Sequence, residues 1–151
     1  MKSINQLNSE GKKEGYWETY YDNGKLQDSG NWISVTEKGF SKRYKHDGQL
    51  YFGIDSIKDG YWERYHYNGQ LHHKGNFVNG KVNGLWEYYR TDGVLFYRCH
   101  YSNGSKEGYC EEYHTNGQLF SRGHCINDNR YGIWEFYHSN NQLYSKELYM
   151  N

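Results

Sequence analysis

The stretch GYWERYHYNGQLHHKG, Gly60–Gly75, decides the fold because the chain contains six recognisable copies of it. Each copy opens on a glycine, and the opening glycines are 24, 21, 24, 24 and 24 residues apart. A fixed period of this length indicates a repeat protein whose unit is one supersecondary element. We therefore expect a single domain over residues 1–151, with a half-unit at 1–14 and repeats at 15–38, 39–59, 60–83, 84–107, 108–131 and 132–151.

Three residue types recur at fixed places within the copies. Tryptophan stands two residues after the opening glycine at Trp17, Trp62, Trp86 and Trp134. Tyrosine stands five residues after it, at Tyr20, Tyr44, Tyr65, Tyr89, Tyr113 and Tyr137. Leucine stands eleven residues after it, at Leu26, Leu50, Leu71, Leu95, Leu119 and Leu143. An Asn-Gly or Asp-Gly pair separates tyrosine from leucine in five copies, which favours a β-hairpin closed by a two-residue type I′ turn.

A two-residue loop fixes which residues oppose each other across every hairpin. It predicts the opposite-charge pairs Glu63–Lys74, Glu87–Arg98, Glu111–Arg122 and Glu135–Lys146. It also places Trp62 across from Gly75 and Trp17 across from Gly30, so that each ring covers bare glycine backbone. On the other face it predicts a ladder in which tyrosines oppose residues such as His72 and Phe96.

The composition favours strands throughout. The chain has no proline and no alanine but 18 tyrosines and 18 glycines, and aromatic residues prefer strands. Short polar links between hairpins require antiparallel neighbours. We expect an all-β fold, an elongated and twisted antiparallel meander of six hairpins with about twelve strands in one sheet. A closed barrel is the structural alternative.

Charge and cysteine content exclude several classes of function. The 18 basic and 18 acidic residues balance, which argues against a nucleic-acid partner. The N-terminal residues lack the apolar run of a signal peptide. Three cysteines, Cys99, Cys110 and Cys125, are too few for a disulfide framework. We expect a cytoplasmic protein with reduced thiols.

The pattern Gly-aromatic-Trp-Glu-x-Tyr, followed by Asn-Gly-x-Leu and Asn-Gly-Lys, resembles the MORN (membrane occupation and recognition nexus) repeat, and most closely its bacterial 24-residue variant. The resemblance extends from about Leu7 to Tyr149. It implies an elongated hairpin sheet that binds proteins, forms dimers or lies near phosphoinositides. Proteins with the bacterial variant often carry the label of antitoxins.

No catalytic site is expected from the sequence. Each repeated glutamate faces a lysine or arginine, which keeps it ionised and removes it as a proton shuttle. Cysteines and histidines gather at Cys99–His100, Cys110, His114 and His124–Cys125. Neighbours in a strand point to opposite faces, so this cluster does not fit a four-ligand zinc site. The simpler interpretation is that the cysteines fill tryptophan or glycine positions, with no cofactor or metal.

A row of mostly basic residues lies beside the hairpin turns. We call Lys45, His66, Arg90, His114 and His138 the tip row; Tyr21 holds the same position in the first copy. One residue per hairpin places the row along one edge of the sheet, at a spacing of about 10 Å. The row is a candidate binding site for an acidic protein surface or for anionic lipid.

Two functions follow from these observations. The first is a non-catalytic scaffold that binds a protein partner, in the finer form an antitoxin or immunity protein that neutralises a toxin. The alternative is a peripheral membrane module that binds anionic lipid or phosphoinositide, and a metal-binding repeat protein is a third interpretation. Unpaired edge strands also favour a homo-oligomer.

Overall fold

The computed structural model describes residues 4–34, 43–44, 50–51 and 56–150. Lys45 of the tip row lies outside these residues. Within the described part of the chain, no helix is long and apolar enough to cross a membrane.

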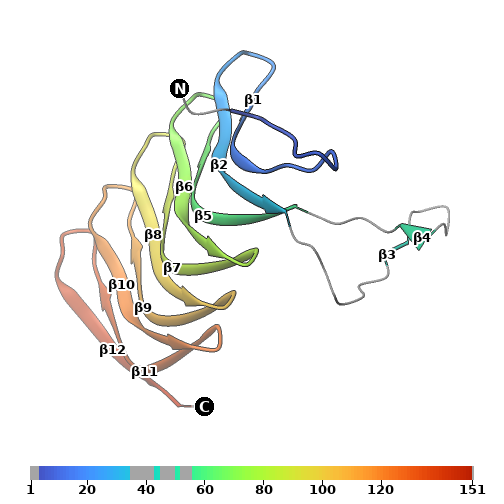
Figure 1. Ribbon diagram of the computed structural model, residues 1–151. Coiled ribbons are helices and arrows are strands. Elements are labelled where there is room, and N and C mark those ends of the chain that lie inside the picture. The colour runs from blue at the N-terminus through green and yellow to red at the C-terminus, as the bar shows by residue number, and fades with distance from the viewer. Residues whose placement is uncertain (1–3, 35–42, 45–49, 52–55, 151) are drawn as a thin grey trace.

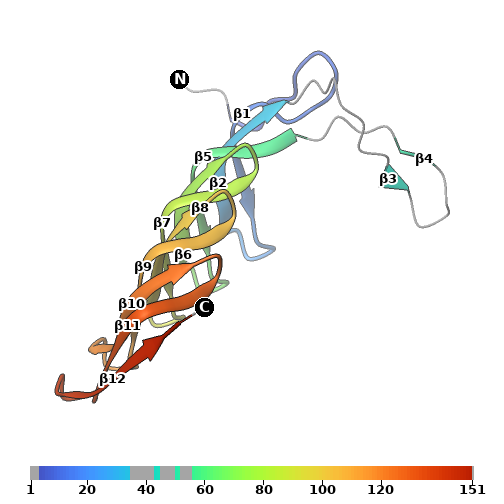
Figure 2. The same ribbon diagram turned by 90° about the horizontal axis from the view of Figure 1, so that it is seen from below.

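The expected all-β antiparallel meander is confirmed. Ten strands form one sheet in the order β1-β2-β5-β6-β7-β8-β9-β10-β11-β12. Their bounds are β1 Gly15–Tyr20, β2 Leu26–Ser34, β5 Ser56–Tyr65, β6 Leu71–Val78, β7 Lys81–Tyr89, β8 Leu95–Ser102, β9 Ser105–Tyr113, β10 Leu119–Ile126, β11 Asn129–Tyr137 and β12 Leu143–Tyr149. The sheet is elongated and strongly bent, with β1 near one end and β12 at the other (Figures 1 and 2). It does not close into a barrel.

The second copy departs from the expected twelve-stranded sheet. Its strands β3 (Arg43–Tyr44) and β4 (Leu50–Tyr51) pair only with each other and lie apart from the sheet in Figure 1. The first copy therefore meets the third directly, because β2 pairs with β5 up to Ser34 and Ser56. At the tips, the Tyr21 hydroxyl donates to the Tyr65 carbonyl at 2.7 Å.

The hairpin turns differ from the predicted type I′ turns. Gly69 N–H donates to the His66 carbonyl at 2.8 Å, and only the glycine of the Asn68-Gly69 pair has a positive φ, +90°. This is a three-residue loop, a type I turn followed by a left-handed glycine. The Asn68 side chain accepts the Gln70 N–H at 3.0 Å and fixes the turn.

The longer turn moves the end of every hairpin by one residue. Each repeat tyrosine pairs with the repeat leucine of its own copy, not with the residue after it. These pairs are Tyr20–Leu26, Tyr44–Leu50, Tyr65–Leu71, Tyr89–Leu95, Tyr113–Leu119 and Tyr137–Leu143. The predicted Tyr65–His72 and Tyr89–Phe96 ladder is therefore wrong. Beyond this shift the predicted register is confirmed for all four Glu–Lys and Glu–Arg pairs and for the two Trp–Gly pairs.

Type I′ turns do occur, but they link one hairpin to the next. Asn79 and Gly80 both have positive φ, +51° and +77°, between the paired residues Val78 and Lys81. Asn103-Gly104 and Asn127-Asp128 repeat this arrangement. Each of these turns also donates to a strand of the preceding hairpin; Gly104 N–H, for example, donates to the Val82 carbonyl at 3.0 Å.

A bulge after each linking turn bends the strands. Between Lys74 and Asn76 the pairing of β6 with β7 shifts, and β7 contains Gly84 at φ +73° opposite the shift. The same shift recurs in β8–β9 and β10–β11. Bulges of this kind bend a strand and increase its twist, which accounts for the curved sheet in Figure 1.

Candidate functional site

The buried tryptophans Trp62, Trp86 and Trp134 lie on one face of the sheet, which we call the tryptophan face. A Cβ atom placed on Gly75 would lie 2.3 Å from the Trp86 ring, so this glycine has no room for a side chain. Gly30 with Trp62 and Gly123 with Trp134 repeat the contact. Each ring thus stacks on a glycine of the preceding hairpin.

The expectation that Trp62 covers Gly75 and that Trp17 covers Gly30 is wrong, although both pairs are aligned as predicted: Gly30 lies under Trp62 and Gly75 under Trp86. A strand has two neighbours, and only the preceding one offers an acceptor for the indole N–H. Trp62 donates to the Asn31 carbonyl at 2.9 Å, beside the bulge where the backbone ladder is interrupted. Trp17 has no such partner within the described residues; it stays half-buried and donates to Glu14 instead.

Cations and a neutral histidine complete the tryptophan face. Lys58 Nζ lies 4.1 Å from the Trp62 ring centre, and the Arg130 guanidinium carbon lies 4.4 Å from that of Trp134. His73 packs against Trp86, with ring centres 5.7 Å apart. Burial lowers the pKa of His73 to about 4, and the positive charge of His72 adds to the effect.

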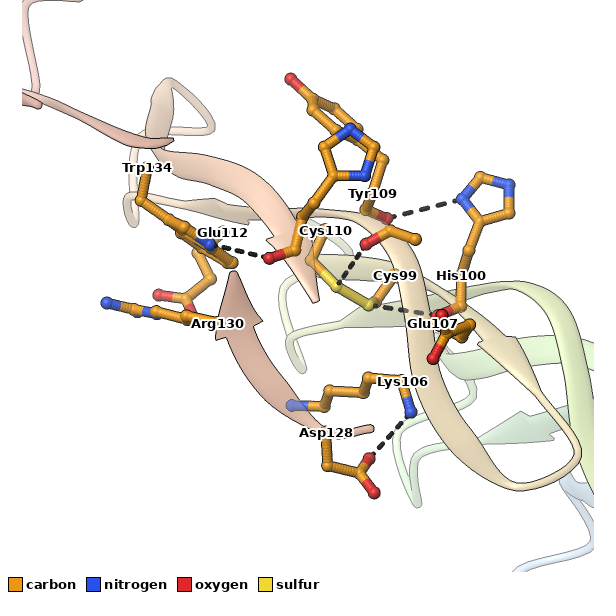
Figure 3. Close-up of a disulfide and its surroundings, with 12 residues drawn as sticks. Cys99, His100, Lys106, Glu107, Tyr109, Cys110, Glu112, Asp128, Arg130 and Trp134 are labelled. Carbon is orange, nitrogen blue, oxygen red and sulfur yellow. Dashed lines mark hydrogen bonds and ion pairs between the residues drawn. A yellow bond between two sulfur atoms is a disulfide. The ribbon is translucent and has the colours of Figure 1, made fainter. Parts of the chain in front are cut away.

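The three cysteines come together in one buried thiol cluster, Cys99, Cys110 and Cys125. Cys99 and Cys110 oppose each other in β8 and β9 and form a disulfide, contrary to the expected reduced thiols (Figure 3). Cys125 is a free, buried cysteine, and burial raises the pKa of its thiol. The neighbouring histidines do not join them: His100 and His124 are exposed.

The repeated glutamates, Glu63, Glu87, Glu111 and Glu135, lie on the opposite face, which we call the glutamate face. Their ion pairs connect successive hairpins. Lys74 pairs with Glu87 of the next hairpin at 3.1 Å, and Arg98 pairs in the same way with Glu111. Glu135 binds both Arg122 and Lys146, at 2.7 and 2.8 Å. Lys146 first, then Arg122, lowers the pKa of the Glu135 carboxyl to about 2. These contacts hold the array together.

The tip row also connects neighbouring hairpins. His66 Nε2 donates to the Tyr89 carbonyl at 2.9 Å, Arg90 to Tyr113 at 3.1 Å, and His114 to Tyr137 at 2.8 Å. His138, in the last hairpin, is exposed and packs on Tyr144, with ring centres 4.6 Å apart. The described members of the row, His66, Arg90, His114 and His138, thus lie beside the hairpin turns, and their role in binding stays a prediction.

An exposed apolar stripe runs along the glutamate face. One residue per hairpin, directly after the opening glycine, contributes to it: Tyr61, Leu85, Tyr109 and Ile133, with exposed fractions of 48%, 39%, 37% and 61%. Each lies two residues before a repeated glutamate and therefore on the same face. The sequence pattern held a signal for this stripe, because the position is apolar or aromatic in all six copies.

A shallow hollow adjoins the stripe near its C-terminal end. His124, Tyr131 and Ile133 line it, together with the backbone around Gly108 and Gly132. The ring of His124 also packs edge-on against Tyr109, at 5.3 Å between centres. Stripe and hollow form one continuous surface on which aromatic and aliphatic groups face solvent.

These features define a repeat scaffold. Residues 13–33, 58–79, 82–103, 106–127 and 130–151 match the MORN repeat variant. The matches cover more than half of the chain, which therefore belongs to this family, as the resemblance implied. They leave out 34–57, in agreement with the separation of β3 and β4 from the sheet. No curated protein matches the chain.

Proposed function

We propose that this MORN repeat protein is a non-catalytic scaffold that binds a protein partner through the apolar stripe. The observation that supports it is the regular exposure of Tyr61, Leu85, Tyr109 and Ile133 on an otherwise charged face. The rings of Trp62, Trp86 and Trp134 are stacked against glycines, and cations lie over Trp62 and Trp134, whereas the stripe residues stay exposed among the described residues. Exposed aromatic and apolar groups at regular spacing favour a protein interface.

The alternative, a lipid-binding module, has less support. Its binding groups would be the cations of the tip row, and His66, Arg90 and His114 already donate to backbone carbonyls of the next hairpin. The net charge is zero, whereas binding to anionic membranes generally needs a polybasic patch. These tip-row side chains therefore already have a structural role, which is to connect neighbouring hairpins.

We further propose that the partner is a toxin, for which this chain would act as an antitoxin or immunity protein. This finer assignment rests on the resemblance to the bacterial repeat variant alone. In that role the chain would block its partner by covering it, so no catalytic group of its own is required.

Affinity capture from a lysate of the host, with mass spectrometry of the bound proteins, tests the proposal. The stripe variant Leu85→Glu/Tyr109→Glu/Ile133→Glu is compared with a control, Tyr67→Glu/Val78→Glu, which changes apolar residues that are equally exposed but lie at turns. We expect one protein at near-equal stoichiometry with the native chain and the control, and its loss with the stripe variant.

A partner that both variants retain would overturn the role of the stripe. Flotation with vesicles containing anionic lipid follows if no protein is captured. Vesicle binding that is lost when His66, Arg90, His114 and His138 are changed to serine would replace the proposal by the lipid alternative.

A further inference from the structure

The thiol cluster occupies one complete inter-hairpin contact of the array. Elsewhere this contact consists of a glycine, the tryptophan that stacks on it, and an aromatic residue beside the tryptophan. Gly30, Trp62 and Phe77 form one such set, with 6.1 Å between the Trp62 and Phe77 ring centres. Cys99, Cys110 and Cys125 stand at the three equivalent positions. All the cysteines of the chain thus replace the three members of a single contact.

The cluster is compact and its three residues are buried. The three Sγ atoms lie within 4.8 Å of one another. The exposed fractions of the three residues are 0%, 1% and 4%. They share a core cluster with Trp134 and Phe136, and Tyr97, Tyr101 and Phe120 pack against this cluster. Figure 3 shows the disulfide between β8 and β9, with Lys106 and Arg130 nearby. Reduction of the disulfide would leave three thiols directed at one point.

The donor set selects the kind of ion. Thiolates prefer soft cations, chiefly Cu(I) and Zn(II). Structural zinc takes four ligands, and within the described residues the cluster offers three sulfurs with no histidine or carboxylate among them. Cu(I) is stable with three thiolates in a trigonal arrangement. We propose that the reduced cluster binds one Cu(I) ion through Cys99, Cys110 and Cys125.

The disulfide must be reduced before the cluster can bind the ion, and a dithiol can act as the reductant. Two electrons and two protons from a dithiol convert the Cys99–Cys110 disulfide into two thiols, and the dithiol becomes a disulfide. Cu(I) then displaces the protons of the three thiols. The site carries a net charge of −2. The cations Lys106 and Arg130 lie near Cys125, as do the carboxylates of Asp128 and Glu112. In the oxidised form Cys125 is the only free donor, so binding depends on the redox state.

The test is a Cu(I) titration of the whole chain, reduced under anaerobic conditions, in competition with a chromogenic Cu(I) chelator. We expect one equivalent per chain. The matched variant Cys99→Gly/Cys110→Trp/Cys125→Phe rebuilds the ordinary contact and is expected to fold. It should bind Cu(I) more than about 100-fold more weakly, since outer-shell changes alone cost 10- to 100-fold.

Two further measurements sharpen the result. The air-oxidised chain should show one titratable thiol after unfolding, against three when reduced, and should not hold Cu(I). The variant Cys125→Ser should lose the high-affinity site while keeping the disulfide. Absence of binding by the reduced chain, equal binding by the triple variant, or tighter binding of Zn(II) than of Cu(I) would each overturn the proposal.

Discussion

At the scale of single residues, the glycines under the tryptophan rings allow each hairpin to pack against the next. The space above Gly75 is filled by the Trp86 ring, so any side chain there must displace the ring or the strand. Gly75 has an ordinary φ, and its requirement for glycine is therefore steric. Glu147 stands at the equivalent position of the last hairpin; its partner across the hairpin, Trp134, stacks on Gly123 instead.

Gly75→Ala is expected to lower the free energy of unfolding by about 2–3 kcal/mol, as overpacking does in a closed site. In the background Trp86→Ala, the same change should cost less by at least about 1 kcal/mol, because the ring that it meets is gone. Urea denaturation of the four proteins measures this coupling. Strictly additive effects would contradict the stacking, and Glu147→Ala, the control, should change stability by less than about 0.5 kcal/mol.

The neutral His73 gives stability a pH dependence. Its pKa is about 4 in the folded chain, against 6.5 for an ordinary histidine. Between these values the unfolded chain binds a proton that the folded chain does not, so stability is full above pH 6.5 and falls as the pH drops toward 4. After allowance for partial exposure we expect a loss of about 1–2 kcal/mol.

Urea denaturation at several pH values between neutral and acidic tests this prediction. The control is His73→Tyr, because Tyr97 fills the equivalent position in the next copy. The part of the pH dependence due to His73 should vanish in this variant. An unchanged pH profile would show that other groups are responsible.

At the scale of hairpins, the sequence predicted the pairing of charges but not the type of turn. Asn-Gly suits both a two-residue type I′ turn and the left-handed end of a longer loop, and this chain uses the first in its links and the second at its tips. The tip loop is fixed by hydrogen bonds such as Asn68 to Gln70, which no pattern of apolar residues reveals.

The sequence contains a signal for the direction in which the tryptophan rings stack. Within its own hairpin Trp86 faces Cys99 and Trp134 faces Glu147, whereas a glycine precedes both in the previous copy. The apolar stripe could be predicted from its recurrence. The ion pairs and tip contacts to the next hairpin could not be predicted. The register shows which residues are opposite each other, but it does not show which of the two adjacent strands a side chain contacts.

The second copy can be removed without loss of the sheet. Ser34 and Ser56 are already paired, so replacing residues 35–55 by Asn-Gly closes β2 and β5 into a hairpin. The shorter loop lowers the entropy cost of closure by about 2 kcal/mol. We expect the same strand content by circular dichroism and a melting temperature at least as high as that of the full chain. A less stable product would show that the second copy supports the sheet.

At the scale of the whole molecule, several repeated contacts between hairpins have a direction. The tryptophan rings reach back to the preceding glycine, whereas Lys74, Arg98 and Arg122 reach forward to the next glutamate and the tip donors reach forward to the next carbonyl. A chain of this kind behaves as a one-dimensional array of nearest-neighbour contacts.

Hydrogen exchange should follow this arrangement. Strands β7 to β10 have hairpins on both sides and are expected to exchange most slowly, while β12, which pairs only with β11, should exchange fastest among the long strands. Mass spectrometry of peptic fragments measures the gradient. Uniform protection along the sheet would mean that the hairpins unfold as one cooperative unit, or that β12 is covered by a second copy.

The carboxylate at position 147 also bears on how such a chain can lengthen by duplication of its gene segments. A unit inserted between two existing hairpins carries its own glycine and its own tryptophan. Its tryptophan can stack on the glycine of the preceding hairpin, and its glycine can receive the tryptophan of the following one. A unit added after β12 would bring its tryptophan against the side chain of Glu147, which no longer allows the ring to settle. A copy that carries a tryptophan therefore fits beside Gly75 or Gly123 but not beside Glu147.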